Sequence, residues 1–123
     1  IYRAAFHVAP TDEEAFADMS TLPPRISLTH QNRAVSSAVA QSGYYGTDAG
    51  QLTRNATRAL AERIELGQVL VGSPETVLGQ VRRVRDSLGA GILDLVVGVQ
   101  LGNKTLRSIE LFGTKVLPRM REL

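Results

Sequence analysis

The chain has 123 residues, 43% of them hydrophobic, which is enough for one modest globular domain and too little for two. Its formal net charge is only +2, without a block of like charges, and this argues against a nucleic-acid-binding surface. Cysteine is absent, so disulfides and thiolate metal sites are excluded. No run approaches the roughly 20 apolar residues of a membrane span, and we expect a soluble cytoplasmic protein.

The first nine residues predict a β-strand that leads directly into a helix. Within the strand, Arg3 and His7 fall on one face because side chains alternate. Thr11 and Glu14 form a capping box, which begins a helix that extends to about residue 19. Since the chain opens inside a structural element, without an initiator methionine, we expect a fragment or a processed product.

Residues 20–50 lack a clear periodicity and predict an irregular insertion or a lid. His30 and the pair Tyr44-Tyr45 lie in this stretch, where they are candidates for contacting a substrate. Packing within a surface loop is the alternative explanation for all three. Helices are predicted over residues 33–40 and 48–66.

Residues 69–100 predict a strand, a helix and a second strand. The short apolar strand at residues 69–71 turns into a helix that has Ser73 as N-cap and Pro74 in its first turn, and Gly89 ends this helix. The polar residues of the helix are expected on its solvent face: Gln80, Arg82, Arg83, Arg85 and Asp86. Residues 92–99 form an almost continuous apolar run, which is typical of a strand covered on both faces. Two strands joined by one helix are expected to be parallel.

After a polar loop at residues 101–104, Thr105 is expected to cap the last helix. The predicted apolar side of this helix consists of Ile109, Phe112, Val116 and Met120. Pro118 is expected to kink or end it. The alternation of strands and helices predicts an α/β fold with a parallel sheet. Three strands are few for such a sheet, so we expect further partners at its edges, from a homo-oligomer or from another part of the protein.

Two parts of the sequence together resemble a known family. One is the Val-Gly-Ser-Pro-Glu-Thr-Val turn into a helix, followed by a glycine-bounded step into an apolar strand and a final helix. That final helix carries Ser108, Leu111, Phe112, Val116, Leu117 and Pro118. The other is the opening strand with Arg3, followed by Val8-Ala9 and an acidic helix start at residues 11–15. In this order, over residues 1–19 and 64–123, they resemble the carboxyl-terminal end of the bacterial luciferase-like flavin-dependent monooxygenases.

The resemblance implies an oxidoreductase that oxidises a small organic substrate with FMN or a deazaflavin. It also implies that this chain is one incomplete domain, the last third or so of a (β/α)8 TIM barrel, because a complete barrel needs about 250 residues. Residues 69–71 and 92–99 would then be the seventh and eighth strands. The catalytic residues would lie upstream and are unknown. The alternative is a non-catalytic fragment or half-barrel that assembles with another chain.

Barrel active sites form at the carboxyl ends of the strands, which gives further candidates. Gly98 would leave room for a flavin ring and Gln100 would hydrogen-bond to it, although a packing glycine and a loop residue are the alternative. Gly72-Ser73 and Gly102 follow the last two strands, where backbone amides bind phosphate in many barrels. A plain N-cap and a plain turn explain these residues equally well.

The remaining polar residues of the strands are assigned in the same way. His7, at the carboxyl end of the first strand, is a candidate substrate contact, with a structural histidine as the alternative. Asp94 lies deeper and is expected to pair with Arg3 or with backbone. Dinucleotide-binding, P-loop and zinc-protease motifs are absent from the sequence, so we expect no metal site.

Overall fold

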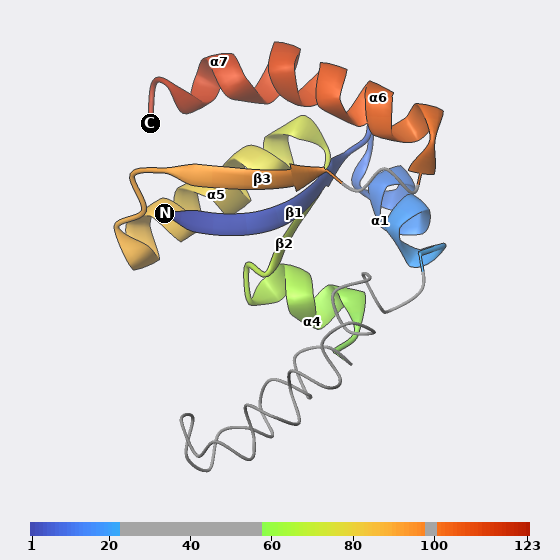
Figure 1. Cartoon of the computed structure of the whole chain (residues 1–123), viewed down its shortest axis with the longest axis horizontal. Helices are drawn as coiled ribbons and strands as arrows, with labels where there is room; N and C mark the ends of the chain where they lie inside the picture. The colour runs from blue at the N-terminus through green and yellow to red at the C-terminus, as the bar shows by residue number, and fades with distance from the viewer. Residues whose placement is uncertain (23–57, 98–100) are drawn as a thin grey trace.

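The structure is a computed structural model that describes residues 1–22, 58–97 and 101–123 (Figure 1). Strands and helices alternate along the chain, and the strands form one parallel sheet, as predicted for an α/β fold. Several expectations lie outside the described residues. They concern His30, Tyr44, Tyr45, Gly98, Gln100, most of the irregular stretch 20–50, the helix at 33–40 and most of the helix at 48–66.

The sheet has three described strands, β1 (Tyr2–Val8), β2 (Val69–Gly72) and β3 (Leu93–Val97), in the order β2-β1-β3. Strands β2 and β3 are parallel, as expected for strands joined by one helix, but β1 lies between them and pairs with both. This order differs from that of a (β/α)8 barrel, in which strands that follow one another in sequence are neighbours.

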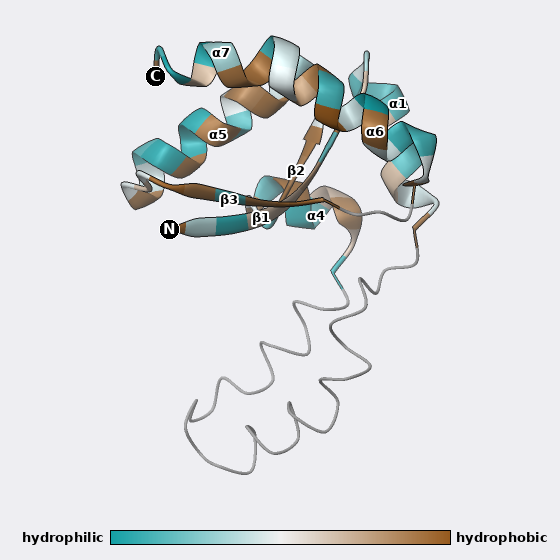
Figure 2. Cartoon of the chain, turned by 45° about the horizontal axis from the view of Figure 1, so that its top comes forward, coloured by the Kyte–Doolittle hydropathy of each residue, from teal (hydrophilic) through white to brown (hydrophobic). Residues whose placement is uncertain are grey.

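Six helical segments of the described residues accompany the sheet. They are α1 (Asp12–Ser20), α4 (Leu60–Glu65), α5 (Pro74–Leu88), α6 (Asn103–Leu111), the π-helical turn η3 (Phe112–Val116) and α7 (Leu117–Met120). Helix α5 and the continuous α6-η3-α7 helix lie over one face, and α4 lies on the other (Figure 1). Successive side chains along each strand point to opposite faces of the sheet. Phe6 and Leu70 belong to the core under α5 and η3, whereas Val69 and Val71 pack with Ala15 of α1. Hydrophobic surfaces therefore meet on both sides of β2 (Figure 2).

Strand β3 is shorter and less covered than predicted. Leu93 and Leu95 pack against the core, on the side that alternation assigns to them. Val96 and Val97 are 44% and 37% exposed, so the expected cover on both faces is wrong for the described part of this strand. The physical reason is that α1 and α4 pack on β2 and leave β3 outside their cover.

The predicted caps of α1 and α5 are confirmed. Thr11 Oγ1 accepts a hydrogen bond from the Glu14 N–H (3.2 Å), and Ser73 Oγ accepts one from the Thr76 N–H (3.4 Å). Gly89 ends α5 with φ +60°, in the left-handed region that glycine adopts most easily. Local sequence therefore determines where α1 and α5 begin and where α5 ends.

Gln80 is the clearest exception to the predicted solvent face of α5. Its side chain is only 4% exposed. Its Oε1 accepts a hydrogen bond from the Val71 N–H (2.9 Å), and its Nε2 donates one to the Val71 carbonyl (2.8 Å). The amide thus takes the place of a neighbouring strand at the outer edge of β2. The placement of Gln80 in solvent was wrong because a side-chain amide satisfies backbone groups that a short edge strand leaves unpaired.

The last helix begins earlier than predicted, and one residue of its predicted apolar side is exposed. Gly102 occupies the N-cap position, and Thr105 is buried inside α6, so its predicted capping role is wrong. Phe112 and Val116 of the predicted apolar side are buried and Met120 packs against the core, but Ile109 is 42% exposed and Ser108 is buried in its stead. Ser108 Oγ accepts a hydrogen bond from the Val8 N–H (2.7 Å), which turns this face of α6 toward β1.

The helix does not end at Pro118. The chain continues into α7 through η3, in which the Leu117 N–H bonds to the Phe112 carbonyl. A proline has no N–H to donate, and a wider turn before it accommodates the missing bond.

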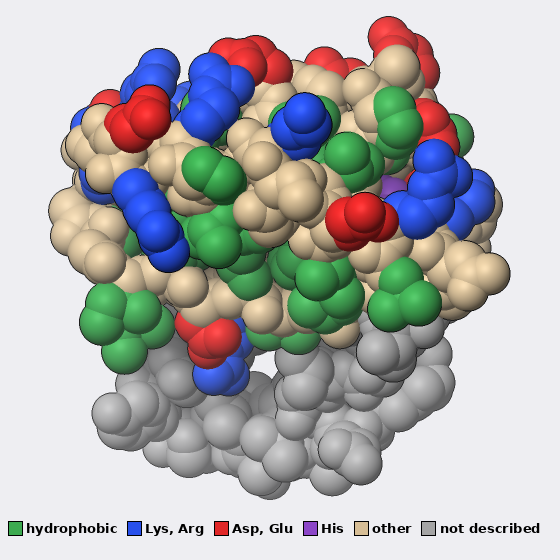
Figure 3. Space-filling view, turned by 90° about the horizontal axis from the view of Figure 1, so that it is seen from above, with side chains coloured by type: hydrophobic (Ala, Val, Ile, Leu, Met, Phe, Trp, Pro, Cys, Tyr) green, Lys and Arg blue, Asp and Glu red, His purple; other side chains and the backbone are tan. Residues whose placement is uncertain are grey.

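Seen from above, hydrophobic side chains interrupt the charged ones on this face of the molecule (Figure 3). Leu106, Ile109 and Leu117 are the large exposed hydrophobic residues of this helix.

Candidate functional site

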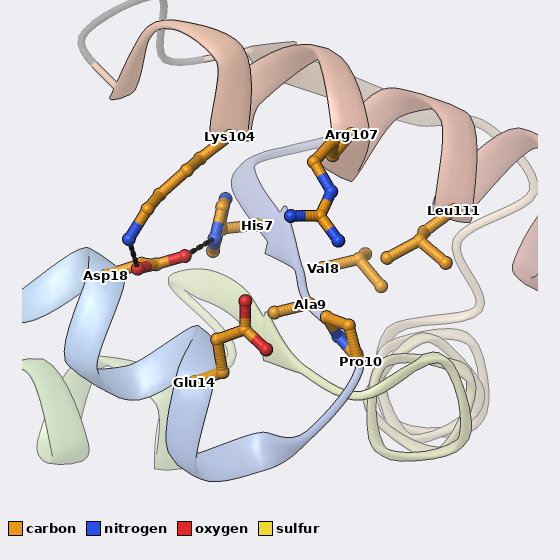
Figure 4. A pocket seen from close by; sticks show the side chains of 9 residues that line it. All are labelled: His7, Val8, Ala9, Pro10, Glu14, Asp18, Lys104, Arg107 and Leu111. Carbon is orange, nitrogen blue, oxygen red and sulfur yellow. Dashed lines mark hydrogen bonds and ion pairs between the residues drawn. The ribbon is translucent and has the colours of Figure 1, made fainter.

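The candidate site lies at the carboxyl end of β1. Strand β1 leads into α1, which packs on one face of the sheet, whereas β3 leads toward α6, which packs on the other. In open parallel sheets, ligands bind outside the carboxyl ends of two neighbouring strands whose connections leave on opposite faces. A hollow is present at this point (Figure 4). Its lining is His7, Val8, Ala9, Pro10, Glu14, Asp18, Lys104, Arg107 and Leu111.

A buried histidine and a buried carboxylate form the floor of the hollow. His7 is 3% exposed and Asp18 is 5% exposed. His7 Nε2 lies 3.1 Å from Asp18 Oδ2, and the ammonium of Lys104 binds the other carboxylate oxygen, Oδ1. His7 comes from β1, Asp18 from α1 and Lys104 from α6, so this cluster joins three elements that are distant in sequence.

The electrostatics of the cluster favour an ionised Asp18. Burial by itself raises the pKa of this carboxyl, but the hydrogen bonds from Lys104 and His7 outweigh it and hold the pKa below its ordinary value of 3.8. A carboxylate accepts hydrogen bonds and cannot donate them, so His7 carries a proton on Nε2. In neutral imidazole the other nitrogen, Nδ1, is then an acceptor.

Nδ1 of His7 has no hydrogen-bond partner among the described residues. This ring nitrogen points away from Asp18 (Figure 4). A buried polar atom without a partner costs free energy unless water or a ligand satisfies it. The cavity volume of the hollow is about 10 Å³, about the space of one water molecule, so it fits a small polar group and not a flavin ring system.

Helix α6 brings two cations to the hollow. Lys104, Arg107 and Leu111 follow helical spacing and share one face of α6. The bond between Ser108 and the Val8 N–H fixes this helix across β1, and the rings of Phe6 and Phe112 pack 5.0 Å apart one turn further on.

Lys104 is engaged with Asp18, but Arg107 has no ion pair within the described residues. Its guanidinium points into the hollow from one side, and Glu14 of α1 faces it from the other (Figure 4). Arginine presents several N–H groups in a planar fork that matches a carboxylate. Arg107 is therefore the group of the hollow that is free to bind an anion.

The corner between β2 and α5 is arranged differently. Asp12 Oδ1 accepts a hydrogen bond from the Ser73 N–H (2.6 Å), and Asp12 Oδ2 accepts one from the Thr76 hydroxyl (2.8 Å). The bond from the Ser73 backbone is the main reason that the pKa of Asp12 lies below its ordinary value. A carboxylate of the chain itself thus occupies the place at the start of α5 where a phosphate would bind.

Gly72 is constrained by the same corner. Its φ is +152°, and a Cβ added there would lie 2.7 Å from Thr76 Cγ2 and 2.8 Å from Asp12 Oδ1. Close packing accounts for a glycine at this position. Gly102 lies elsewhere, before α6, with φ +55° and with nothing close to an added Cβ. The predicted phosphate role of Gly72, Ser73 and Gly102 stays a prediction.

The sequence pointed to one residue of the hollow as a candidate site residue, His7, and missed its partners. Asp18 follows Ala15 by three residues on the buried face of α1, and a carboxylate in an apolar stripe was a usable signal. The polar run at residues 101–104 predicts a loop, whereas Lys104 lies in α6, at helical spacing from Arg107 and Leu111. The predicted pairing of Asp94 with Arg3 is confirmed, because Arg3 Nε donates to its Oδ2 (2.7 Å), but the Asp94 side chain is 41% exposed and does not lie deep.

The described residues contain no group of three or more acidic or histidine side chains arranged to hold a metal ion. Among the helices of this part of the chain, none has the length and apolar character needed to cross a membrane. Comparisons with protein families, with curated proteins and with solved structures found no match to this chain.

Proposed function

We propose that the chain is the carboxyl-terminal segment of a flavin-dependent oxidoreductase, of the luciferase-like type, that oxidises a small organic substrate. The observation that carries this is the resemblance of residues 1–19 and 64–123, whose segments coincide with elements of one parallel α/β sheet. The opening strand and acidic helix start are β1 and α1, the Gly-Ser-Pro turn joins β2 to α5, and the final helix is α6-η3-α7.

FMN or a deazaflavin would supply the redox chemistry, and the described residues fit only part of such a cofactor. The Ser73 amide is occupied by Asp12, so a phosphate at the start of α5 does not fit this arrangement. The hollow at β1 accepts a small polar group and not the ring system. We therefore assign most flavin contacts to residues outside the described part, and assign to His7 and Arg107 a contact with the substrate.

The proposed wider fold is a (β/α)8 barrel in which β1, β2 and β3 are three of the strands. Such a barrel requires β2 to lie between β1 and β3, whereas the described sheet has β1 in the middle. The Val71 N–H and carbonyl, which face outward from β2, would then bind β3 and release Gln80. Formation of such a barrel would have to exchange these strand neighbours.

A second candidate is a small-molecule-binding α/β domain that does not use a flavin. The strand order β2-β1-β3 favours it, because this order creates the point between β1 and β3 at which open sheets bind ligands. The hollow with His7 lies at that point.

Flavin titration separates the two candidates. The protein is purified in the assembly in which it occurs in its own cells, and the fluorescence of added FMN and of a deazaflavin is measured. Saturable quenching with one flavin per chain is expected for the oxidoreductase, with riboflavin as the control for the contribution of the phosphate. No saturable binding of either flavin would overturn the oxidoreductase and leave the binding domain.

A further inference from the structure

The hollow at the carboxyl end of β1 has a ligand preference that follows from its own groups. We propose that it binds the hydroxyl-bearing carboxylate end of a small hydroxy acid. In this site His7 Nδ1 accepts a hydrogen bond from the ligand hydroxyl, and the Arg107 guanidinium pairs with the ligand carboxylate. Asp18 acts as a positioning residue for His7.

The preference for a hydroxyl follows from the Asp18–His7 pair. The Asp18 carboxylate, bound by Lys104, accepts a hydrogen bond from the Nε2–H of His7, so in the neutral imidazole the unpaired ring nitrogen, Nδ1, offers a lone pair. A lone pair selects a donor such as O–H and repels a bare oxyanion. The buried position of His7 makes the satisfaction of this nitrogen worth more than it would be in water.

The preference for a carboxylate follows from the charges around the hollow. Asp18 and Lys104 neutralise one another, and Arg107 is the cation that remains available among the described residues. Glu14 lies across the hollow and disfavours a second negative charge on the ligand. The small cavity volume limits the buried part of the ligand to a group about the size of a hydroxyl.

Binding at this site requires no flavin, so its test is independent of the proposed oxidoreductase. The probe is glycolate, which carries both groups. Acetate lacks the hydroxyl and glycolamide lacks the charge. Binding is followed on the whole chain, without flavin, by the ¹⁵N shifts of the His7 ring and by titration calorimetry. We expect glycolate to bind at least about tenfold more tightly than acetate or glycolamide and to shift the His7 Nδ1 resonance.

A matched pair of variants tests the anion contact. Arg107→Gln is expected to weaken glycolate binding about tenfold or more, because it removes the free guanidinium. Lys115→Gln removes the same charge from the exposed surface of the same helical segment, outside the hollow, and is expected to change binding less than about twofold. Asp18→Asn is expected to move the ring proton between the nitrogens of His7, which the ¹⁵N shifts report even if stability falls.

Three results would overturn the site. They are equal affinity for glycolate and acetate, equal losses in Arg107→Gln and Lys115→Gln, and a glycolate complex that leaves the His7 ring shifts unchanged. Because no flavin is present, none of these results bears on flavin binding, and absence of flavin binding would not affect them.

Discussion

The carboxyl ends of β2 and β1 lie at the same edge of the sheet, but polar groups are satisfied within the chain at the first and, in the part of the chain that the structure describes, left unpaired at the second. At the end of β2, the start of α5 is closed by Asp12, which takes the Ser73 N–H and the Thr76 hydroxyl. At the end of β1, the hollow contains a buried histidine with one nitrogen unpaired among the described residues and an arginine without an ion pair. Both corners carry the sequence features of a ligand site. The difference teaches that a site is recognised by the groups that remain unsatisfied after folding.

The largest effect is expected at the floor of the hollow. Asp18→Ala should lower the free energy of unfolding by about 3 kcal/mol, because it leaves His7 and Lys104 without their buried partner. Urea unfolding measures this loss. Glu13→Ala, an exposed change on the same helix, is the control and should alter stability by less than about 0.5 kcal/mol. Equal effects of the two changes would mean that the cluster is not formed.

The same carboxylate predicts a pH dependence. The pKa of Asp18 is lower in the folded protein than its ordinary value of 3.8, so the folded state binds this proton less readily than the unfolded chain. Its stabilising contribution is therefore complete above about pH 5 and is lost as the pH falls through the folded pKa, below 3.8. The stability difference between the protein and Asp18→Ala should shrink over this acid range.

At the closed corner, Gly72→Ala should cost about 2 kcal/mol, since the new methyl group meets Thr76 and Asp12 and the backbone has a φ of +152°. Gly79→Ala is the matched control, because Gly79 is helical and has nothing near an added Cβ. It should stabilise the protein by roughly 0.5 kcal/mol. If Gly72→Ala left the free energy of unfolding unchanged, the packing of Thr76 and Asp12 around Gly72 would be looser than described.

Opening the closed corner should have a smaller effect. Asp12→Asn weakens the bonds to Ser73 and Thr76 at a partly exposed site, and should cost roughly 1 kcal/mol at neutral pH. The pKa of Asp12 in the folded protein is below its ordinary value of 3.8, so this cost should shrink as the pH falls from 3.8 through the folded pKa. Thermal unfolding of the protein and of Asp12→Asn at pH 7 and at pH 3 measures the cost at neutral pH and its decrease in acid. The same variant should gain inorganic phosphate binding if the Ser73 amide is a phosphate site that Asp12 blocks.

The smallest effect on stability is expected for the exposed pair of Arg3 and Asp94, whose side chains are 74% and 41% exposed. Arg3→Ala should cost less than about 0.5 kcal/mol of the free energy of unfolding.

The same two positions, Arg3 and Asp94, test the strand order that places the hollow between β1 and β3. The chain has no cysteine, so Arg3→Cys with Asp94→Cys introduces one defined pair at positions that oppose one another in the sheet. A short thiol cross-linker should join them, and failure would favour the sequential order of a barrel.

Local elements could be predicted from the sequence because their determinants are local. Thr11, Ser73 and Gly89 mark helix ends through bonds or φ values within a few residues. The strand order could not be predicted, since each strand's neighbours depend on contacts across the whole chain. The buried faces of α5 and α6 were misjudged at Gln80 and Ser108 for the same reason. Each of these polar side chains is buried because a distant backbone group requires a partner.

The Gln80 amide also has a consequence for assembly. Strand β2 has four residues, and with the Val71 N–H and carbonyl already bonded, its outer edge offers too little backbone for another strand to add. Within the described sheet, β2 and β3 are the two edge strands, and only the outer edge of β3 has no side-chain amide bound along it. A sheet that can grow from one edge alone stops at two copies, because pairing β3 with β3 of a second copy uses the available edge of both. If copies paired through their sheets, Gln80 would therefore favour a closed dimer over an open fibre.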